Sequence, residues 1–210
     1  MKNKQDINKM FQEAGILLAI TIIAGLALGF VYELTKEPIA YQEALKVQNA
    51  CKEVFNIADS FEEVEQDVDA ATRASSVMDT ATENSVKLGT IYKALSKDAS
   101  LLGYVIEVTS TEGYNGNIEM MMGITMDGTL NGISLLSISE TPGLGMRAQE
   151  VLVPQFSGKT VSVFTYTQTG AITDDQIDAI SGATITTKAV TNAINTGLSY
   201  FEQVLKEGGN

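Results

Sequence analysis

The sequence contains no histidine and no tryptophan, and Cys51 is its only cysteine. These absences exclude several kinds of functional site. A Ser-His-Asp triad, a zinc site with Cys and His ligands, a His-ligated haem and a Cys-ligated iron–sulfur cluster all require side chains that this chain lacks. An intramolecular disulfide is excluded as well. No catalytic residue and no metal site of these kinds is therefore expected.

Basic residues are also scarce. The chain has 14 lysines and arginines against 26 acidic residues, and its formal net charge is −12. Beyond position 32 there are 11 basic and 24 acidic residues, so that part carries a formal charge of −13. Proteins that bind nucleic acid present a basic patch or stripe to the phosphates. No such stripe is present, and nucleic acid is not an expected partner.

One uncharged, mostly apolar run of 19 residues, Ala14–Tyr32, lies near the N-terminus. As a helix it is roughly 28 Å long, close to the hydrocarbon core of a bilayer at about 30 Å. The run predicts a transmembrane helix over 14–32 that contacts membrane lipid. The alternative is a cleaved signal peptide, for which Ala27 and Gly29 would provide the small-residue site.

Lysine placement predicts the orientation of this helix. Lys2, Lys4 and Lys9 precede the apolar run, and Lys36 is the only nearby basic residue after it. Positive residues favour the cytoplasmic side. We therefore expect a single-pass protein of the cell (inner) membrane, with residues 1–13 in the cytoplasm and the rest of the chain outside.

Residues 33–89 predict a helical stalk and an acidic region. Thr35–Asn56 has helical composition, with Pro38 placed as the first turn of a helix tolerates, and with an apolar stripe that includes Cys51. Cys51 is interpreted as a small buried hydrophobic residue rather than a redox group. Asp59–Asp69 contains six acidic and no basic residues. Its spacing does not match an EF-hand loop, so a solvated acidic surface is preferred over a calcium site.

From Thr90 onward the sequence predicts a mainly antiparallel sheet packed by helices. Five β-rich runs follow one another: Ile91–Leu95, Gly103–Thr109, Ile118–Met126, Thr129–Ser139 and Val161–Tyr166. Asp127-Gly128 predicts a two-residue hairpin loop. Alternating apolar residues precede it and are assigned to the core: Met120, Met122, Ile124 and Met126.

The last predicted element is a helix of about twenty residues that begins near Thr184 and ends before Gly208. Its apolar face is expected to pack on the sheet and consists of Val190, Ile194, Leu198, Phe201 and Leu205. With the membrane helix, this arrangement gives an α+β fold class. Residues 90–210 are expected to form one domain.

The segment Asp178–Thr186 leads directly into this helix. Small and hydroxyl residues there leave backbone N–H groups exposed at a helix N-terminus, and Gly182 allows close approach to the backbone. This pattern is typical of a site for a phosphate. The alternative is an ordinary N-cap made by Ser181 or Thr184.

The residues Asp178, Ser181, Gly182, Ala183, Thr184 and Thr186 together resemble the flavinylation motif of the FMN-binding domains in Rnf complexes and in sodium-pumping NADH:quinone reductases. The resemblance implies that a flavin transferase, using FAD, joins the phosphate of FMN to Thr184 through a phosphoester. An upstream segment, Glu140–Gly145, is similar to a second segment of that family. The likeness extends over residues 14 to 205.

The resemblance further implies an FMN-binding domain on a membrane anchor that relays electrons within an Rnf-type ferredoxin:NAD oxidoreductase coupled to ion translocation. The chain resembles the G component of the Rnf complex, which implies the other Rnf subunits as partners. The C component of the quinone reductase, typically longer, is one alternative. An extracytoplasmic binding module without a redox role is another.

The Glu140–Gly145 segment predicts a turn, since Pro142 fixes its own φ and Gly143 accepts conformations closed to other residues. A turn does not explain the apolar Leu144, whose burial would be worth about 1.5–3 kcal/mol. We expect Leu144 to pack on the isoalloxazine, with Thr141 or a backbone N–H bonded to the ring's polar edge. The expected cofactor-binding residues are Thr184, Ser181, Gly182, Ala183, Asp178, Glu140, Thr141, Gly143 and Leu144.

Overall fold

The structure is a computed structural model that describes residues 2–64 and 85–206, with side chains from Asn8 onward. The chain forms two compact units, Met1–Leu45 and Lys46–Asn210. Three residues of the acidic segment, Glu65, Asp67 and Asp69, lie outside the described residues. The second unit contains both sequence motifs.

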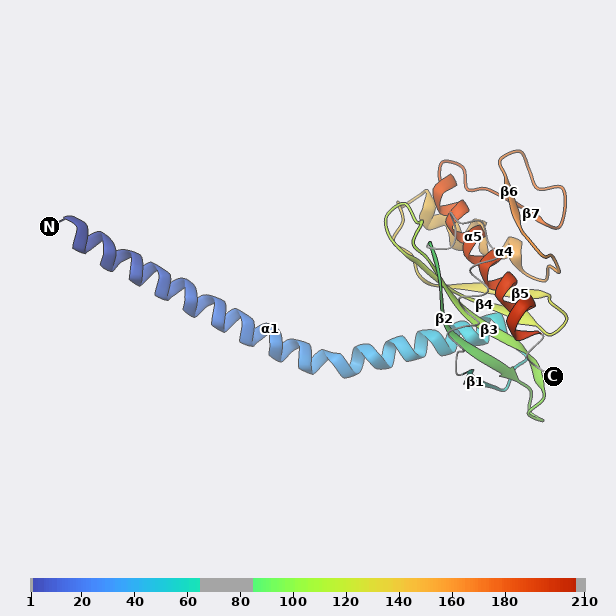
Figure 1. Ribbon diagram of the computed structural model, residues 1–210, viewed down its shortest axis with the longest axis horizontal. Coiled ribbons are helices and arrows are strands. Elements are labelled where there is room, and N and C mark those ends of the chain that lie inside the picture. The colour runs from blue at the N-terminus through green and yellow to red at the C-terminus, as the bar shows by residue number, and fades with distance from the viewer. Residues whose placement is uncertain (1, 65–84, 207–210) are drawn as a thin grey trace. The chain divides into compact units, whose positions relative to one another are not determined.

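The N-terminal unit is helical. It belongs to a single helix α1, Lys2–Val54, which contains the whole apolar run (Figure 1). This helix is long and apolar enough to cross a membrane, and its large apolar side chains, such as Leu26 and Phe30, are exposed. The stalk predicted over Thr35–Asn56 continues the helix of the apolar run, because α1 runs through Pro38 without a break. A proline inside a helix removes one backbone hydrogen bond and need not end a helix of this length.

The second unit is built on a five-stranded antiparallel sheet of order β1-β2-β3-β4-β5 (Figure 1). The strands are β1 (Ser60–Val64), β2 (Val86–Leu95), β3 (Leu101–Ser110), β4 (Ile118–Thr125) and β5 (Leu130–Ser137). The predicted antiparallel sheet is therefore confirmed. Strand β1 was not predicted, because its sequence SFEEV is rich in glutamate. In the structure both glutamates are exposed at the edge of the sheet.

The fifth predicted run, Val161–Tyr166, is strand only from Thr165. Strands β6 (Thr165–Thr167) and β7 (Gln176–Asp178) form a separate parallel pair. The earlier residues are excluded from the ladder because Phe164 bonds to a helix instead. Its N–H donates to Asn195 Oδ1 at 2.8 Å, and its carbonyl accepts from Asn195 Nδ2 at 2.9 Å.

The hairpin between β4 and β5 lies at Asp127-Gly128, as predicted, but its loop has three residues. The N–H of Gly128 donates to the Thr125 carbonyl at 2.9 Å, and Gly128 has a φ of +88°. A type I turn followed by a glycine of positive φ is the usual three-residue loop. The Asp127 carboxylate accepts from the Thr125 hydroxyl and from the Thr129 N–H, and these bonds lower its pKa. The side chain of Asp127 therefore stabilises the longer loop.

One face of the sheet packs against α5 (Thr184–Tyr200) and the π-helical turn η2 (Phe201–Leu205) (Figure 1). All five residues of the predicted apolar face are buried there. Met120 and Met122 of β4 are buried in the same cluster, which confirms their core role. The packing is close at Gly197, where an added Cβ would lie 2.1 Å from Met122 Sδ.

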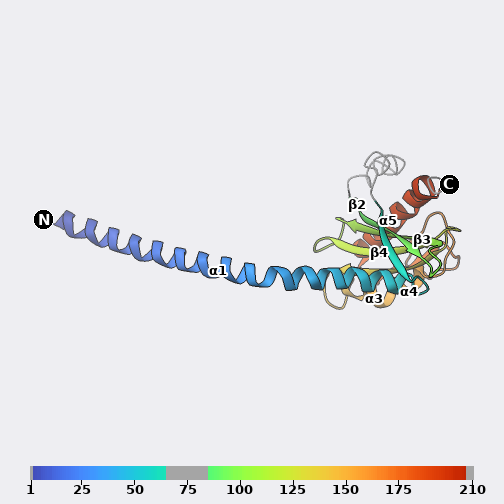
Figure 2. The same cartoon turned by 90° about the horizontal axis from the view of Figure 1, so that it is seen from below.

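The other face of the sheet is covered by the last turns of α1, residues 46–54, as Figure 2 shows. Ala50, Cys51, Val54 and Phe55 are buried against Val105 and Met121. The buried position predicted for Cys51 is confirmed. Burial raises the pKa of its thiol to about 11, so the thiol stays protonated near neutral pH and is a poor nucleophile.

The chain between β5 and α5 carries both motifs. It contains η1 (Gly145–Arg147), α3 (Ala148–Val151) and α4 (Val153–Phe156), followed by β6 and β7. Ala148, Leu152 and Phe156 are buried in the main core. The ring of Phe156 also packs edge-on against Phe164, with centroids 4.9 Å apart. These contacts anchor the segment after Glu140–Gly145 on the same core that holds α5.

Candidate functional site

A cavity of about 490 Å³ lies where the two motif segments meet. Volumes in this range are typical of small-molecule sites. The residues that line it come from three loops, the start of η1 and the first turn of α5: Tyr114, Thr141, Leu144, Gly145, Gly182, Ala183, Thr184, Ile185 and Thr186. The fold thus brings together segments that are far apart in the sequence.

Helix α5 begins at the cavity with Ala183 as its N-cap, and no described side chain caps it. The alternative of an ordinary N-cap by Ser181 or Thr184 is therefore wrong. Gly182 has a φ of +78° and turns the chain so that alanine occupies the cap position. The first N–H groups of a helix have no intrahelical acceptor, and they lie at the positive end of its dipole. The helix start therefore offers uncapped donors to an anion.

The turn before α5 is held from within by Thr187. The N–H of Ile180 donates to Thr187 Oγ1 at 3.1 Å, and that hydroxyl donates to the Ala183 carbonyl at 3.0 Å. The N–H of Ala183 closes the turn onto the Ile180 carbonyl at 3.0 Å. Because these groups satisfy one another, the turn is formed without a ligand.

Glu140 joins three segments behind the cavity. Glu140 is only 5% exposed, and its carboxylate accepts from the Thr186 hydroxyl at 3.0 Å and from the Asn115 N–H at 3.4 Å. Gly145 is pressed against this pair, since an added Cβ would lie 2.5 Å from Thr186 Oγ1 and 2.8 Å from Glu140 Oε2. Glu140 therefore connects its own loop to α5 and to the β3–β4 loop.

The hydroxyl groups of the motif differ in accessibility. Thr184 is exposed and faces the cavity, whereas Thr186 is 1% exposed and Thr187 is fully buried. Thr184 Oγ1 accepts one hydrogen bond, from Gln168 Nε2 at 3.3 Å. Ser181 is exposed but is not among the residues that line the cavity.

Large apolar side chains surround the cavity. Tyr114 is 68%, Ile185 51% and Leu144 40% exposed, and all three line it. Exposed apolar groups gathered at one hollow are typical of a site for an apolar or aromatic ligand. Leu144 was singled out from the sequence. Tyr114 was missed, because nothing in its local sequence distinguishes it from an ordinary loop tyrosine.

Besides Ser181 and Glu140, two further expected site residues, Asp178 and Gly143, are not among the residues that line the cavity. The Asp178 carboxylate accepts the Ala171 N–H at 2.6 Å, and the Asp178 backbone N–H and carbonyl both bond to the side-chain amide of Gln155. Gly143 has a φ of +77°, and no atom lies within 4 Å of the position of an added Cβ. Its role is therefore to provide the positive φ of the turn. Neither residue is among those that line the cavity.

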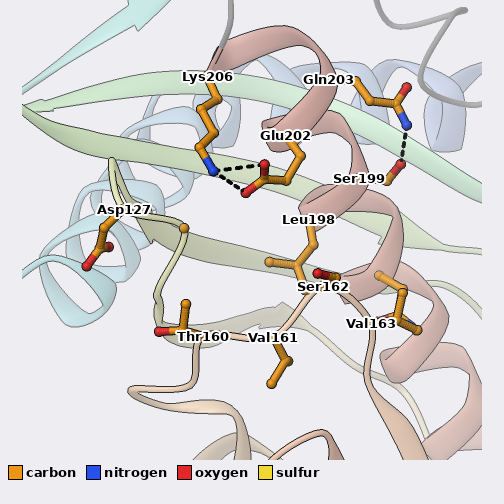
Figure 3. Close-up of a pocket in the computed structure, with 12 residues that line it drawn as sticks. Asp127, Thr160, Val161, Ser162, Val163, Leu198, Ser199, Glu202, Gln203 and Lys206 are labelled. Atoms are coloured by element: carbon orange, nitrogen blue, oxygen red, sulfur yellow. Dashed lines mark hydrogen bonds and ion pairs between the residues drawn. The ribbon is translucent and has the colours of Figure 1, made fainter.

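A second cavity, of about 780 Å³, lies at the opposite end of α5 (Figure 3). Its wall combines the Asp127-Gly128 loop, the extended segment 160–163 and the last turns of α5 and η2. Its lysine, Lys206, is paired with Glu202 at 2.8 Å. The residues that line this cavity include none of the motif residues. The cavity at the start of α5 is therefore the candidate site.

Comparison with known proteins supports this choice. Residues 113–199 match the family model of the FMN-binding domain, and residues 1–54 match that of the RnfG N-terminal region. The G component of the Na(+)-translocating ferredoxin:NAD(+) oxidoreductase complex of Acetobacterium woodii is 32% identical over 206 residues, 96% of each chain. The G component of the ion-translocating oxidoreductase complex of Methanosarcina acetivorans is 30% identical over 95% of this chain and 97% of its own.

Among solved structures, NqrC of Shewanella oneidensis aligns with a TM-score of 0.47 and 20% identity. The alignment covers 56% of this chain and 59% of that one. The FMN-binding-domain match, residues 113–199, includes Tyr114, the Glu140–Gly145 loop and the start of α5.

Proposed function

The chain belongs to the RnfG family of ion-translocating oxidoreductase complexes, and we propose that it carries FMN as a phosphoester on Thr184. As a membrane-anchored flavoprotein it relays electrons within an Rnf-type complex whose other subunits are its partners. The complex transfers electrons between ferredoxin and NAD and couples this transfer to ion translocation. Because the chain belongs to this family, we set aside the alternative that it is the C component of a sodium-pumping NADH:quinone reductase.

One observation carries the proposal: the exposed Thr184 hydroxyl stands at a cavity that joins uncapped helix N–H groups to an apolar rim. The two features fit the two ends of FMN. Backbone donors and a helix dipole suit a phosphate, and Tyr114, Leu144 and Ile185 suit a flat aromatic ring. When bound, FMN supplies the redox chemistry, and the chain supplies its position and surroundings.

Thr184 is favoured over the neighbouring hydroxyl groups by its accessibility. Thr186 is buried and donates to Glu140, and Thr187 is buried within the turn. Neither is open to a second enzyme without local unfolding. Ser181 is exposed but stands outside the cavity lining. A transferase that approaches from solvent therefore meets Thr184 at the cavity.

The phosphate of the ester retains a negative charge, yet none of the described residues that line the cavity is charged. The nearest lysine on the helix, Lys188, pairs with Glu112 at 3.3 Å. We infer that the N–H groups at the start of α5 and the helix dipole balance the phosphate charge, as at other phosphate-binding helix ends.

In-gel fluorescence tests the covalent attachment. The full chain is produced with and without a flavin transferase, denatured and separated by electrophoresis. The proposal predicts a fluorescent flavin band only with the transferase. If protein produced with the transferase gives a band without flavin fluorescence, then the remaining alternative is a binding module without a redox role.

The orientation proposed for the anchor places the flavin domain outside the cytoplasm. Protease added to spheroplasts is expected to digest the part of the chain after Glu33, because the lysines before the helix keep the N-terminus inside. A tag at the N-terminus should stay protected in the same experiment. Protection of the flavin domain until the membrane is opened would reverse the topology.

Leu144→Ala tests the proposed contact with the ring. The variant is expected to retain covalent FMN, since Thr184 is unchanged, but to show an altered visible spectrum and a midpoint potential shifted by about 10–30 mV. A shift of 30 mV corresponds to about 1.4 kcal/mol for a two-electron couple. The control is Met146→Ala, because Met146 is about equally exposed but is not among the lining residues. A redox titration of Leu144→Ala that matches wild type would leave Leu144 as part of a plain turn.

A further inference from the structure

The parallel pairing of β6 and β7 explains why a glutamine lies beside Thr184. Thr167 is paired with Asp178 at the ends of the two strands, and the Ala179 N–H extends the pairing to the Thr167 carbonyl at 2.8 Å. Parallel strands end at the same edge of their sheet. Gln168, the first residue after β6, therefore emerges beside the segment that leads from β7 to Thr184.

Gln168 contacts the atom that would carry the flavin. Its side-chain Nε2 donates to Thr184 Oγ1 at 3.3 Å. Since the hydroxyl accepts this bond, its own hydrogen is directed away from Gln168. One lone pair of the oxygen remains free. The contact restricts the orientations that the Thr184 hydroxyl adopts.

Asp178 holds the loop 168–172, which carries Gln168, by a hydrogen bond. The Ala171 N–H donates to Asp178 Oδ1 at 2.6 Å. Asp178 is itself held by Gln155, whose Oε1 accepts its N–H at 2.6 Å and whose Nε2 donates to its carbonyl at 3.1 Å. The carboxylate is therefore engaged by the loop, and its described contacts do not include Thr184. This explains what an aspartate of the motif does outside the cavity.

We propose that Gln168 orients the Thr184 hydroxyl for attachment of FMN, and that Asp178 is a positioning residue that acts through the loop 168–172. The inference rests on the proposed function. In the step concerned, Thr184 Oγ1 bonds to the FMN phosphorus of FAD and the phosphoanhydride bond breaks. AMP leaves, and the hydroxyl proton passes to a base on the transferase. No oxidation or reduction takes place.

The kinetics of transfer test the role of Gln168. Full-length chain, a flavin transferase and FAD are mixed, and covalent flavin is followed by intact-protein mass. Gln168→Ala is expected to lower kcat about three- to tenfold, the range for loss of one neutral hydrogen bond, and to leave the KM for FAD unchanged. Gln168→Glu, which cannot donate at neutral pH, should be at least as slow. The matched control Gln149→Ala, at an exposed glutamine of α3, should behave as wild type.

Two substitutions separate positioning by Asp178 from catalysis by its carboxylate. Asp178→Asn keeps an oxygen that accepts the Ala171 N–H, so its rate should stay within about twofold of wild type, whereas Asp178→Ala should be as slow as Gln168→Ala. The double variant Gln168→Ala/Asp178→Ala should be no slower than Gln168→Ala alone, because residues that act through one contact are not additive. Thermal melts of the variants identify any general loss of folding.

The possible outcomes are distinct. A wild-type rate for Gln168→Ala overturns the proposal, as does an Asp178→Asn rate as low as that of Asp178→Ala, which would mean that the charge itself is required. Additive losses in the double variant also contradict it. If wild type takes no flavin under these conditions, the proposed function fails, which the wild-type reaction alone reveals.

Discussion

Thr184→Val is expected to abolish covalent FMN while the chain stays folded and bound to the membrane. Valine keeps the branched shape and lacks only the Oγ1 that would form the ester. Thr184 is the exposed first residue of α5, and the one described side-chain bond that it loses comes from Gln168. Exposed substitutions of this kind change the free energy of unfolding by about 0.5 kcal/mol or less. Intact-protein mass and a thermal melt measure the two effects.

Neighbouring hydroxyls provide the controls for this experiment. Ser181→Ala should load fully, because Ser181 does not line the cavity. Thr186→Val should also load, but with a lower melting temperature, since it leaves the buried Glu140 carboxylate without the donor at 3.0 Å. Covalent FMN on Thr184→Val would contradict the assignment and would make Thr186 the next candidate.

Glu140→Ala is expected to cause a large loss of stability. The buried Thr186 hydroxyl and the Asn115 N–H both lose their acceptor, and a hollow remains beside Gly145. An unsatisfied buried group costs about 1–3 kcal/mol, so the free energy of unfolding should fall by about 2–4 kcal/mol. Denaturant unfolding of the full chain measures this loss. The flavin site should loosen with it, because Glu140 joins the loop of Leu144 to α5.

Two variants set the scale for Glu140. Glu140→Gln keeps one acceptor oxygen for two donors and should lose about half as much stability as alanine. Glu150→Ala, at an exposed glutamate of α3, should unfold as wild type does. If Glu140→Ala and Glu150→Ala unfold at the same denaturant concentration, then the three segments are held together by other contacts.

The regular elements could be predicted because the spacing of their apolar residues matches the face that each element buries. The five apolar positions of α5 and η2 and the alternating residues of β4 are all packed as expected. Features that depend on contacts between distant segments were missed. Strand β1 forms because its backbone pairs with β2. Phe164 is not part of a strand because its N–H donates to the Asn195 side chain and not to a neighbouring strand. Neither interaction can be predicted from the local sequence.

The candidate site shows the same division. Both motif segments were recognised from the sequence, and the structure places them at one cavity. Their meeting depends on a buried pair, Glu140 and Thr186, which a sequence pattern cannot reveal. Tyr114 and Gln168 escaped notice because each reaches the site from a different loop. The structure excludes the alternative of an N-cap by Ser181 or Thr184, since Ala183 occupies the cap position after Gly182, whose φ is positive.

Fragmentation of one peptide tests the attachment of FMN to Thr184 most directly. Trypsin releases residues 160–188 as a single peptide, which contains Ser181, Thr184, Thr186 and Thr187. Wild-type chain, loaded by a flavin transferase, should give this peptide with the added mass of FMN, and the fragment ions should place that mass on Thr184. An unmodified peptide, or FMN on any other residue of it, would contradict the account.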